Sequence, residues 1–270
     1  MSCPRGAKVP RLTALLALAP TVLLSASTAR PLPRSRVLSR PLPRLEAAYG
    51  NRPLSFEPNL GQTDPRVRFL TRGAGATTFL TDTGAVMVLA RNGARDAEQA
   101  VVRMRLIHAR MPRFAAGLEK LPGIGNYFIG NDPKKWRTGI PNYAKVAFQG
   151  VYPGVNLVYR GNQRRLEYDF VVAPGANPAL IELAYDGVDS VDVDPDGDLL
   201  LATGLGTLRQ HKPVIYQETA GRRVEVAGGY EIRGRRVGFA LAGYDASRPL
   251  VIDPMVEYST YLGGSGDDYP

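Results

Sequence analysis

Four aspartates at alternate positions carry the sharpest chemical signal in the sequence. The stretch "DVDPDGDLLL" (residues 192–201) matches D-x-D-x-D-G, the ligand-rich start of a calcium-binding loop. These candidate metal ligands are Asp192, Asp194, Asp196 and Asp198. However, the position at which such a loop supplies a bidentate glutamate is Thr203, and the flanking residues favour strands over helices. Because Pro-Asp-Gly is also a common turn sequence, we predict a β-hairpin with no cofactor, and weak calcium binding is the alternative.

Two carboxylates lie two residues apart in "RRLEYDFVV" (residues 164–172). Strand periodicity places Glu167 and Asp169 on one face, opposite Leu166, Tyr168, Phe170 and Val172. Two converging carboxyl groups are the catalytic groups of a glycosidase, so the pair is a candidate for a secreted hydrolase. Such alternation is also typical of the solvated side of a sheet, and we predict that simpler arrangement.

Nucleophilic catalysis has little support in the sequence. Only two histidines are present, His108 and His211, and neither has an acidic neighbour or the spacing of a metal site. The stretch "GGSGD" around Ser265 lacks the second glycine of the G-x-S-x-G elbow. The only cysteine is Cys3. We therefore expect a protein that is not an enzyme.

Aromatic residues gather in residues 126–161, which include the only tryptophan, Trp136, and Tyr143. Exposed Trp and Tyr rings beside Asn and Asp would suit a carbohydrate-binding surface. Because tryptophan is heavily buried on average, we favour a Trp136 ring that covers the core beneath the loop "GNDPKKW". Trp136 and Tyr143 remain the candidate ligand-binding residues.

The net charge of +9 is concentrated at the N-terminus. Eight basic residues and no acidic residue precede Glu46, which leaves 26 basic and 25 acidic residues in the remainder. A folded nucleic-acid-binding protein needs its positive charge on a face of the domain. We therefore expect no nucleic-acid partner.

The N-terminus has the three parts of a secretory signal peptide: basic residues, the apolar stretch 12–24, and small residues at 27–29. We predict a signal peptide over residues 1–29 and a Pro/Arg-rich linker over 30–48. No second apolar run is long enough for a membrane helix, so we expect no membrane span in the mature chain. The expected location is extracellular or at the cell surface.

From residue 54 onward the dominant pattern has period two. Short β-rich runs such as 67–72, 77–81, 85–90 and 101–107 are separated by glycine-rich turns. This spacing predicts an all-β, β-sandwich-like domain of many short antiparallel strands over residues 49–254, as one unit or as two β subdomains.

Several long stretches resemble a known family. They are "PLSFEPNLGQTDPRVRFLTRG", "NYFIGNDPKKW", "YAKVAFQGVYPGVNLVYRGNQRRLEYDFVVAPGANP", "KPVIYQE" and "YDASRPLVIDP". The chain resembles the N-terminal domain of unknown function in exported bacterial proteins with SBBP repeats, which are proposed to form a β-propeller. Residues 255–270, with "YSTYLGGSGDD", look like the truncated start of the first repeat. The resemblance implies a cell-surface or extracellular location and supplies no catalytic residues, and the aspartates at 192–198 are not part of its pattern.

We therefore expect a secreted or cell-surface, non-enzymatic accessory or interaction module that precedes a β-propeller repeat region. Its expected partners are a surface glycan or protein and, in a longer form of the chain, the downstream repeats. An extracellular carbohydrate-binding domain is the alternative. We also expect residues 256–262 to pack poorly, because a lone blade strand has no sheet to join.

Overall fold

The computed structural model describes residues 54–73, 76–90, 99–162 and 165–258. The predicted signal peptide, the linker and residues 259–270 lie outside this range. The described chain is built of strands, with two three-residue 3-10 turns, η1 (Pro133–Lys135) and η2 (Pro178–Leu180). None of its helical segments is long and apolar enough to cross a membrane. The all-β prediction is confirmed.

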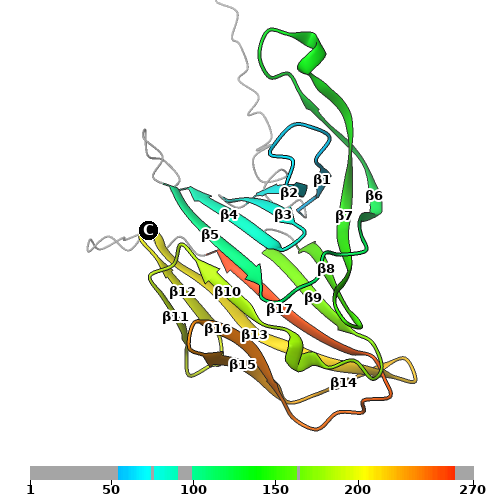
Figure 1. Ribbon diagram of the computed structural model, residues 1–270, viewed down its shortest axis with the longest axis vertical. Coiled ribbons are helices and arrows are strands. Elements are labelled where there is room, and N and C mark those ends of the chain that lie inside the picture. Colours follow the sequence, from blue (N-terminus) through cyan, green and yellow to red (C-terminus); the bar gives the residue numbers. More distant parts are fainter. Residues whose placement is uncertain (1–53, 74–75, 91–98, 163–164, 259–270) are drawn as a thin grey trace, which may run out of the picture. The chain divides into compact units, whose positions relative to one another are not determined.

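The first sheet has eight antiparallel strands in the spatial order β1-β2-β3-β4-β5-β10-β16-β15 (Figure 1). Their bounds are β1 Glu57–Pro58, β2 Val67–Gly73, β3 Ala76–Thr81, β4 Gly84–Ala90, β5 Gln99–Leu106, β10 Leu183–Asp186, β15 Gly228–Arg233 and β16 Arg236–Leu241. The runs at 67–72, 77–81, 85–90 and 101–107 thus form β2 to β5, as their alternation predicts.

The second sheet has nine antiparallel strands in the order β11-β12-β13-β17-β9-β8-β7-β6, with β14 also paired to β13. Their bounds are β6 Phe114–Tyr127, β7 Arg137–Tyr152, β8 Val155–Asn162, β9 Arg165–Val172, β11 Ser190–Val193, β12 Leu199–Thr203, β13 Gly206–Thr219, β14 Arg222–Glu225 and β17 Leu250–Tyr258.

The two sheets share one hydrophobic core, which confirms the sandwich-like architecture. Tyr168 and Phe170 of β9 point into it, and the Phe170 ring contacts Phe239 of the first sheet at a centroid distance of 6.0 Å. A buried hydrogen bond of 3.0 Å also joins the sheets, from the Tyr185 hydroxyl to Gln210 Oε1. The described strands therefore form one β unit.

Strand β17 corrects the prediction for the end of the domain. It lies between β13 and β9, and Val256 pairs with Gln210 on one side and Leu166 on the other. Alternation continues through Pro254 to Val256, which is 6% exposed, so the core-facing pattern holds the strand in the sheet. The expectation of an unpaired strand is wrong for residues 256–258, and the rest of that segment lies outside the described residues.

Strands β6 and β7 form a long hairpin, which we call the arm (residues 114–152). Only residues 145–152 of β7 also pair with β8, so the part of the arm beyond them extends past the neighbouring strands (Figure 1). The bridge between Phe56 and Tyr143 braces the arm where it leaves the sheet. The sequence did not predict β6, because its glycines and Pro122 interrupt any alternation and shift its register.

Candidate functional site

The aspartate-rich stretch forms the predicted hairpin, with β11 and β12 paired on either side of the turn. Asp194 Oδ1 accepts hydrogen bonds from the backbone amides of Asp196 and Asp198, both at 3.0 Å. Gly197 has a φ of +88°, which favours glycine at this position. Asp192 and Asp196 are exposed. Turn chemistry therefore accounts for this combination of residues.

Two of the four aspartates, Asp194 and Asp198, also form ion pairs with an arginine of the same chain. Arg209 Nη1 lies 2.7 Å from Asp194 Oδ2 and 2.9 Å from Asp198 Oδ2. Burial alone would raise the pKa of Asp198, but the Lys212 amide and Arg209 together lower it. Among the described residues, no group of three or more His, Cys, Asp or Glu side chains could hold a metal ion. Weak calcium binding stays a prediction.

His211 lies between two acids that the sequence did not connect with it. Its Nδ1 is 3.0 Å from Asp198 Oδ2, and its Nε2 is 2.8 Å from Glu257 Oε2. Both ring nitrogens therefore face carboxylates, whereas a general base for a serine needs one nitrogen directed at the hydroxyl. His108 lies in the turn after β5 of the other sheet.

Glu167 and Asp169 share a face as predicted, but that face is not solvated there. They are 5% and 7% exposed, which makes the solvated-strand prediction wrong. Arg160 of β8 binds both acids, with Nε 2.6 Å from Glu167 Oε2 and Nη1 2.9 Å from Asp169 Oδ2. Its Nη2 lies 2.5 Å from Asp253 Oδ2 of β17. We call these four residues the Arg160 cluster.

The Arg160 cluster holds three carboxyl groups against one guanidinium. Burial and the nearby Asp253 charge raise the pKa of Asp169 to about 7, although Arg160 opposes the shift. A carboxyl with that pKa could serve as a general acid, so the hydrolase alternative stays a prediction. The same contacts have a structural explanation, because three adjacent strands are tied together by one arginine. Asp253 was not predicted, since it lies 84 residues after Asp169 in the sequence.

Trp136 lies at the end of the arm, outside the core cluster. Its ring is 37% exposed and contacts the edge of Phe128 at a centroid distance of 5.2 Å. Its Nε1 donates a 3.1 Å hydrogen bond to the Gly130 carbonyl and so closes the loop between β6 and β7. The expectation that this ring covers the core is wrong, because the loop extends past the sheet edge. We call residues 124–137 the arm tip.

Tyr143 lies at the base of the arm and is half-buried. Its ring packs edge-on to Phe69, with a centroid distance of 6.4 Å, and against the backbone of Gly117. Tyr143 lies seven positions after Trp136, which corresponds to roughly 23 Å along an extended strand. The two candidate residues therefore do not form one continuous platform.

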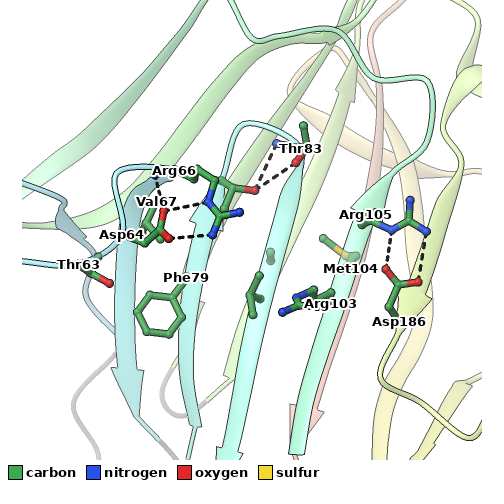
Figure 2. Close-up of a pocket in the computed structure, with 13 residues that line it drawn as sticks. Thr63, Asp64, Arg66, Val67, Phe79, Thr83, Arg103, Met104, Arg105 and Asp186 are labelled. Carbon is green, nitrogen blue, oxygen red and sulfur yellow. Dashed lines mark hydrogen bonds and ion pairs between the residues drawn. The ribbon is translucent and has the colours of Figure 1, made fainter.

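A groove on the outward face of the first sheet was not predicted from the sequence. It has a volume of about 600 Å³, and Phe79 and Val86 contribute apolar surface to it. Figure 2 shows two ion pairs at its sides, Asp64–Arg66 and Arg105–Asp186, with Arg103 between them. The alternation of "VVRMRLI" predicted that Arg103 and Arg105 face outward, but not the groove itself.

The groove has one uncommitted cation. Arg66 and Arg105 are each neutralised by an aspartate 2.8 Å and 2.6 Å away, respectively. Within the described part of the chain, Arg103 makes no ion pair. Val86 pairs with Phe79 on one side and with Arg103 on the other, so this guanidinium next to an apolar strip would suit an anion with an apolar portion.

Comparisons with known proteins give one match. A family model described as a domain of unknown function (DUF7948) matches residues 56–255. This range begins at Phe56, which braces the arm, and ends within β17, so it includes both sheets. No curated protein and no solved structure matches the chain.

Proposed function

The chain belongs to the DUF7948 family of domains of unknown function, and we propose that it acts as an exported, non-enzymatic interaction module. The proposal places it in the extracellular space or on the cell surface, where it contacts a partner. The signal-peptide pattern of residues 1–29 supports export.

The observation that carries the proposal is the exposed apolar surface of the arm tip. Phe128, Ile129 and Trp136 are 63%, 60% and 37% exposed, and they lie within one nine-residue loop. Burying such side chains is favourable, so apolar residues gathered at an exposed position indicate a contact surface.

The candidate catalytic groups support a non-enzymatic role for a different reason. Arg160 holds Glu167, Asp169 and Asp253, and His211 faces carboxylates at both ring nitrogens. These polar groups are therefore committed to one another. Hydrolysis of any member of a glycosidase and esterase panel by the pure protein, lost in Glu167→Gln, would overturn this part of the proposal.

Export and the longer architecture can be tested together. Residues 1–48 fused to alkaline phosphatase should give periplasmic activity, because this enzyme needs disulfides that form outside the cytoplasm.

We also propose that the module precedes β-propeller repeats, on the strength of "YSTYLGGSGDD" in residues 255–270. Reading the DNA beyond codon 270 should show more such units. Absence of periplasmic activity from the alkaline phosphatase fusion, which we call a silent export fusion, would contradict export.

The interaction itself is tested with the surface of intact cells. Labelled protein should bind washed cells of the source organism, and Phe128→Ser,Ile129→Ser should lose that binding. Val214→Ser,Val224→Ser is the matched control, because both valines are 51% exposed but lie on β13 and β14. Equal binding by the tip variant and the wild type would show that the tip is not the contact surface.

Carbohydrate binding is the second candidate, and the exposed Trp136 ring favours it. Trp136 is the only tryptophan, so its fluorescence reports on this site alone. A saturable change in Trp136 fluorescence on titration with one polysaccharide would support a glycan site. Trp136→Phe should then fail to bind the same polysaccharide in a separate binding assay. Tyr143→Phe should leave that binding unchanged, because Tyr143 lies at the other end of the arm. No response across a broad glycan panel would remove this candidate.

A further inference from the structure

The arm tip combines its apolar residues with positive charge. Residues 124–137 include Lys134, Lys135 and Arg137 but only one acid, Asp132, which gives a net charge of +2. Asp132 Oδ1 accepts a 3.0 Å hydrogen bond from the Lys134 amide and so caps the η1 turn. In the part of the chain that the structure describes, neither lysine makes an ion pair. Their ammonium groups are therefore available to an anionic partner.

The charge of Arg137 is held by carbonyl groups and not by a carboxylate. Its Nε donates to the Leu60 carbonyl at 2.9 Å, and Nη1 donates to the carbonyls of Lys134 and Trp136 at 3.3 Å and 3.1 Å. These bonds fasten the loop to the segment between β1 and β2. The positive charge remains uncompensated, while the loop is held in shape.

The tip presents its apolar residues in a preformed arrangement. The Asp132 cap, the Trp136–Gly130 hydrogen bond and the contact between the Trp136 and Phe128 rings all act within nine residues. Phe128 and Ile129 cannot reach the core from this position and stay more than half exposed. A loop already held in its bound shape loses little conformational freedom on binding.

We propose that the arm tip binds an anionic lipid surface. The inference rests on the proposed function of the tip as a contact surface and names its partner. Phe128, Ile129 and Trp136 enter the boundary between headgroups and acyl chains, where amphipathic aromatic rings are favoured. Lys134 and Lys135 contact the lipid phosphates.

The shape of the tip favours lipid over a protein partner. One loop at the end of a two-stranded arm is narrow, and a stable protein interface buries about 800 Å² on each side. A fluid bilayer surrounds a projecting loop on all sides, so a small group of apolar residues can be buried completely. Figure 1 shows the arm extending beyond the neighbouring strands, and Phe128 and Ile129 at its end are more than half exposed.

The experiment uses the full chain and the emission of its only tryptophan. Vesicles of phosphatidylcholine with phosphatidylglycerol should shift Trp136 emission to shorter wavelength, and brominated acyl chains should quench it. Phosphatidylcholine alone should do neither. Pelleting with vesicles is not sufficient, because the eight basic residues before Glu46 could hold the chain to anionic lipid without moving Trp136.

Two variants test the two contributions. Lys134→Ala,Lys135→Ala should raise the lipid concentration at the midpoint of the emission shift roughly thirty-fold, since each lysine near an anionic surface contributes a factor of about five to binding. Phe128→Ser,Ile129→Ser should abolish quenching by brominated lipid. Lys120→Ala,Arg222→Ala removes the same charge away from the tip and should change the midpoint far less.

The outcomes separate this proposal from the proposed function. A shift that needs no anionic lipid, or that survives both tip variants, would overturn the lipid assignment. An emission shift with a soluble acidic polysaccharide or polyglutamate, and none with vesicles, would also overturn the lipid assignment. A contact function of the tip would then still stand. Hydrolase activity or a silent export fusion would instead overturn the proposed function.

Discussion

At the scale of single residues, Arg160 forms ion pairs with three acids at once. It binds Glu167 and Asp169 of β9 and Asp253 of β17, and these acids are at most 14% exposed. Removing one partner of a buried ion pair leaves the others without compensation, which costs more than the pair contributes when intact. An exposed pair such as Arg105–Asp186 has no comparable effect, because water and salt screen it.

Replacing Arg160 should therefore destabilise the fold strongly. We expect Arg160→Met to lower the free energy of unfolding by roughly 3–5 kcal/mol at neutral pH. Arg105→Met should cost less than about 1 kcal/mol, because Arg105 and its partner Asp186 are both about half exposed. Urea denaturation of the two variants checks the contrast, and equal losses would show that the Arg160 cluster is not a buried ion cluster.

Asp169 should make stability depend on pH in the direction opposite to most aspartates. Its pKa is raised to about 7 by burial and by Asp253, from an unfolded value of about 4. Between these values the folded state keeps a proton that the unfolded state releases, so stability falls as pH rises through this window and then levels off.

Asp169→Asn should remove that dependence. The melting temperature of the variant minus that of the wild type should be larger at pH 8 than at pH 5, because only the wild type must ionise a buried carboxyl. Asp189→Asn, at an exposed position, should give a difference that does not change with pH. A difference for Asp169→Asn that shrinks with rising pH would contradict the shift.

At the scale of elements, the arm depends on a close contact at its base. A Cβ added at Gly117 of β6 would lie 2.4 Å from the Tyr143 ring on β7. That ring also packs against Phe69 of the other sheet, so it cannot move freely. The glycine that hides β6 from sequence prediction is therefore needed for the arm to lie against β2.

Gly117→Ala should loosen the arm and leave the sheets intact. We expect a loss of about 1–3 kcal/mol, because the tyrosine ring or the strand must shift. Amide hydrogen exchange should accelerate in β6 and in residues 137–144 of β7 but not in β9 or β17. Gly229→Ala meets no atom within 4 Å and should change neither stability nor exchange. Uniform acceleration would show instead that the arm and the core unfold together.

At the scale of the whole described domain, the two sheets pack on one shared core. Aromatic contacts run from Phe148 through Tyr159, Tyr168 and Phe170 to Phe239, and they cross from one sheet to the other. The hydrogen bond from Tyr185 to Gln210 also joins the two sheets, and Gln210 donates in turn to the Tyr168 hydroxyl within the second sheet. Neither sheet could bury its apolar face without the other.

Phe170→Ala should therefore weaken both sheets at once. The side chain is fully buried, and its removal should cost roughly 3–5 kcal/mol. Far-UV circular dichroism and near-UV tyrosine signals should still fall in one coincident transition at a lower denaturant concentration. Two separated transitions would indicate two β subdomains.

Features that depend on near neighbours could be predicted without the structure. Strand alternation predicted β2 to β5 and β9, and Pro-Asp-Gly predicted the turn before β12, because both depend on residues a few positions apart. It also showed that Glu167 and Asp169 share a face. The N-terminal concentration of positive charge is likewise visible without any structure.

Which distant groups meet could not be predicted from the sequence and depends on the packing of the strands. Strand register joins Arg160 to Asp253, and His211 to Asp198 and Glu257, across separations that no local pattern reveals. In the tertiary structure the Tyr143 ring also packs against Phe69, and Trp136 lies at the end of the arm. The physical reason is that burial and pairing depend on how strands far apart in the chain align, whereas alternation depends only on the chain's own two-residue repeat.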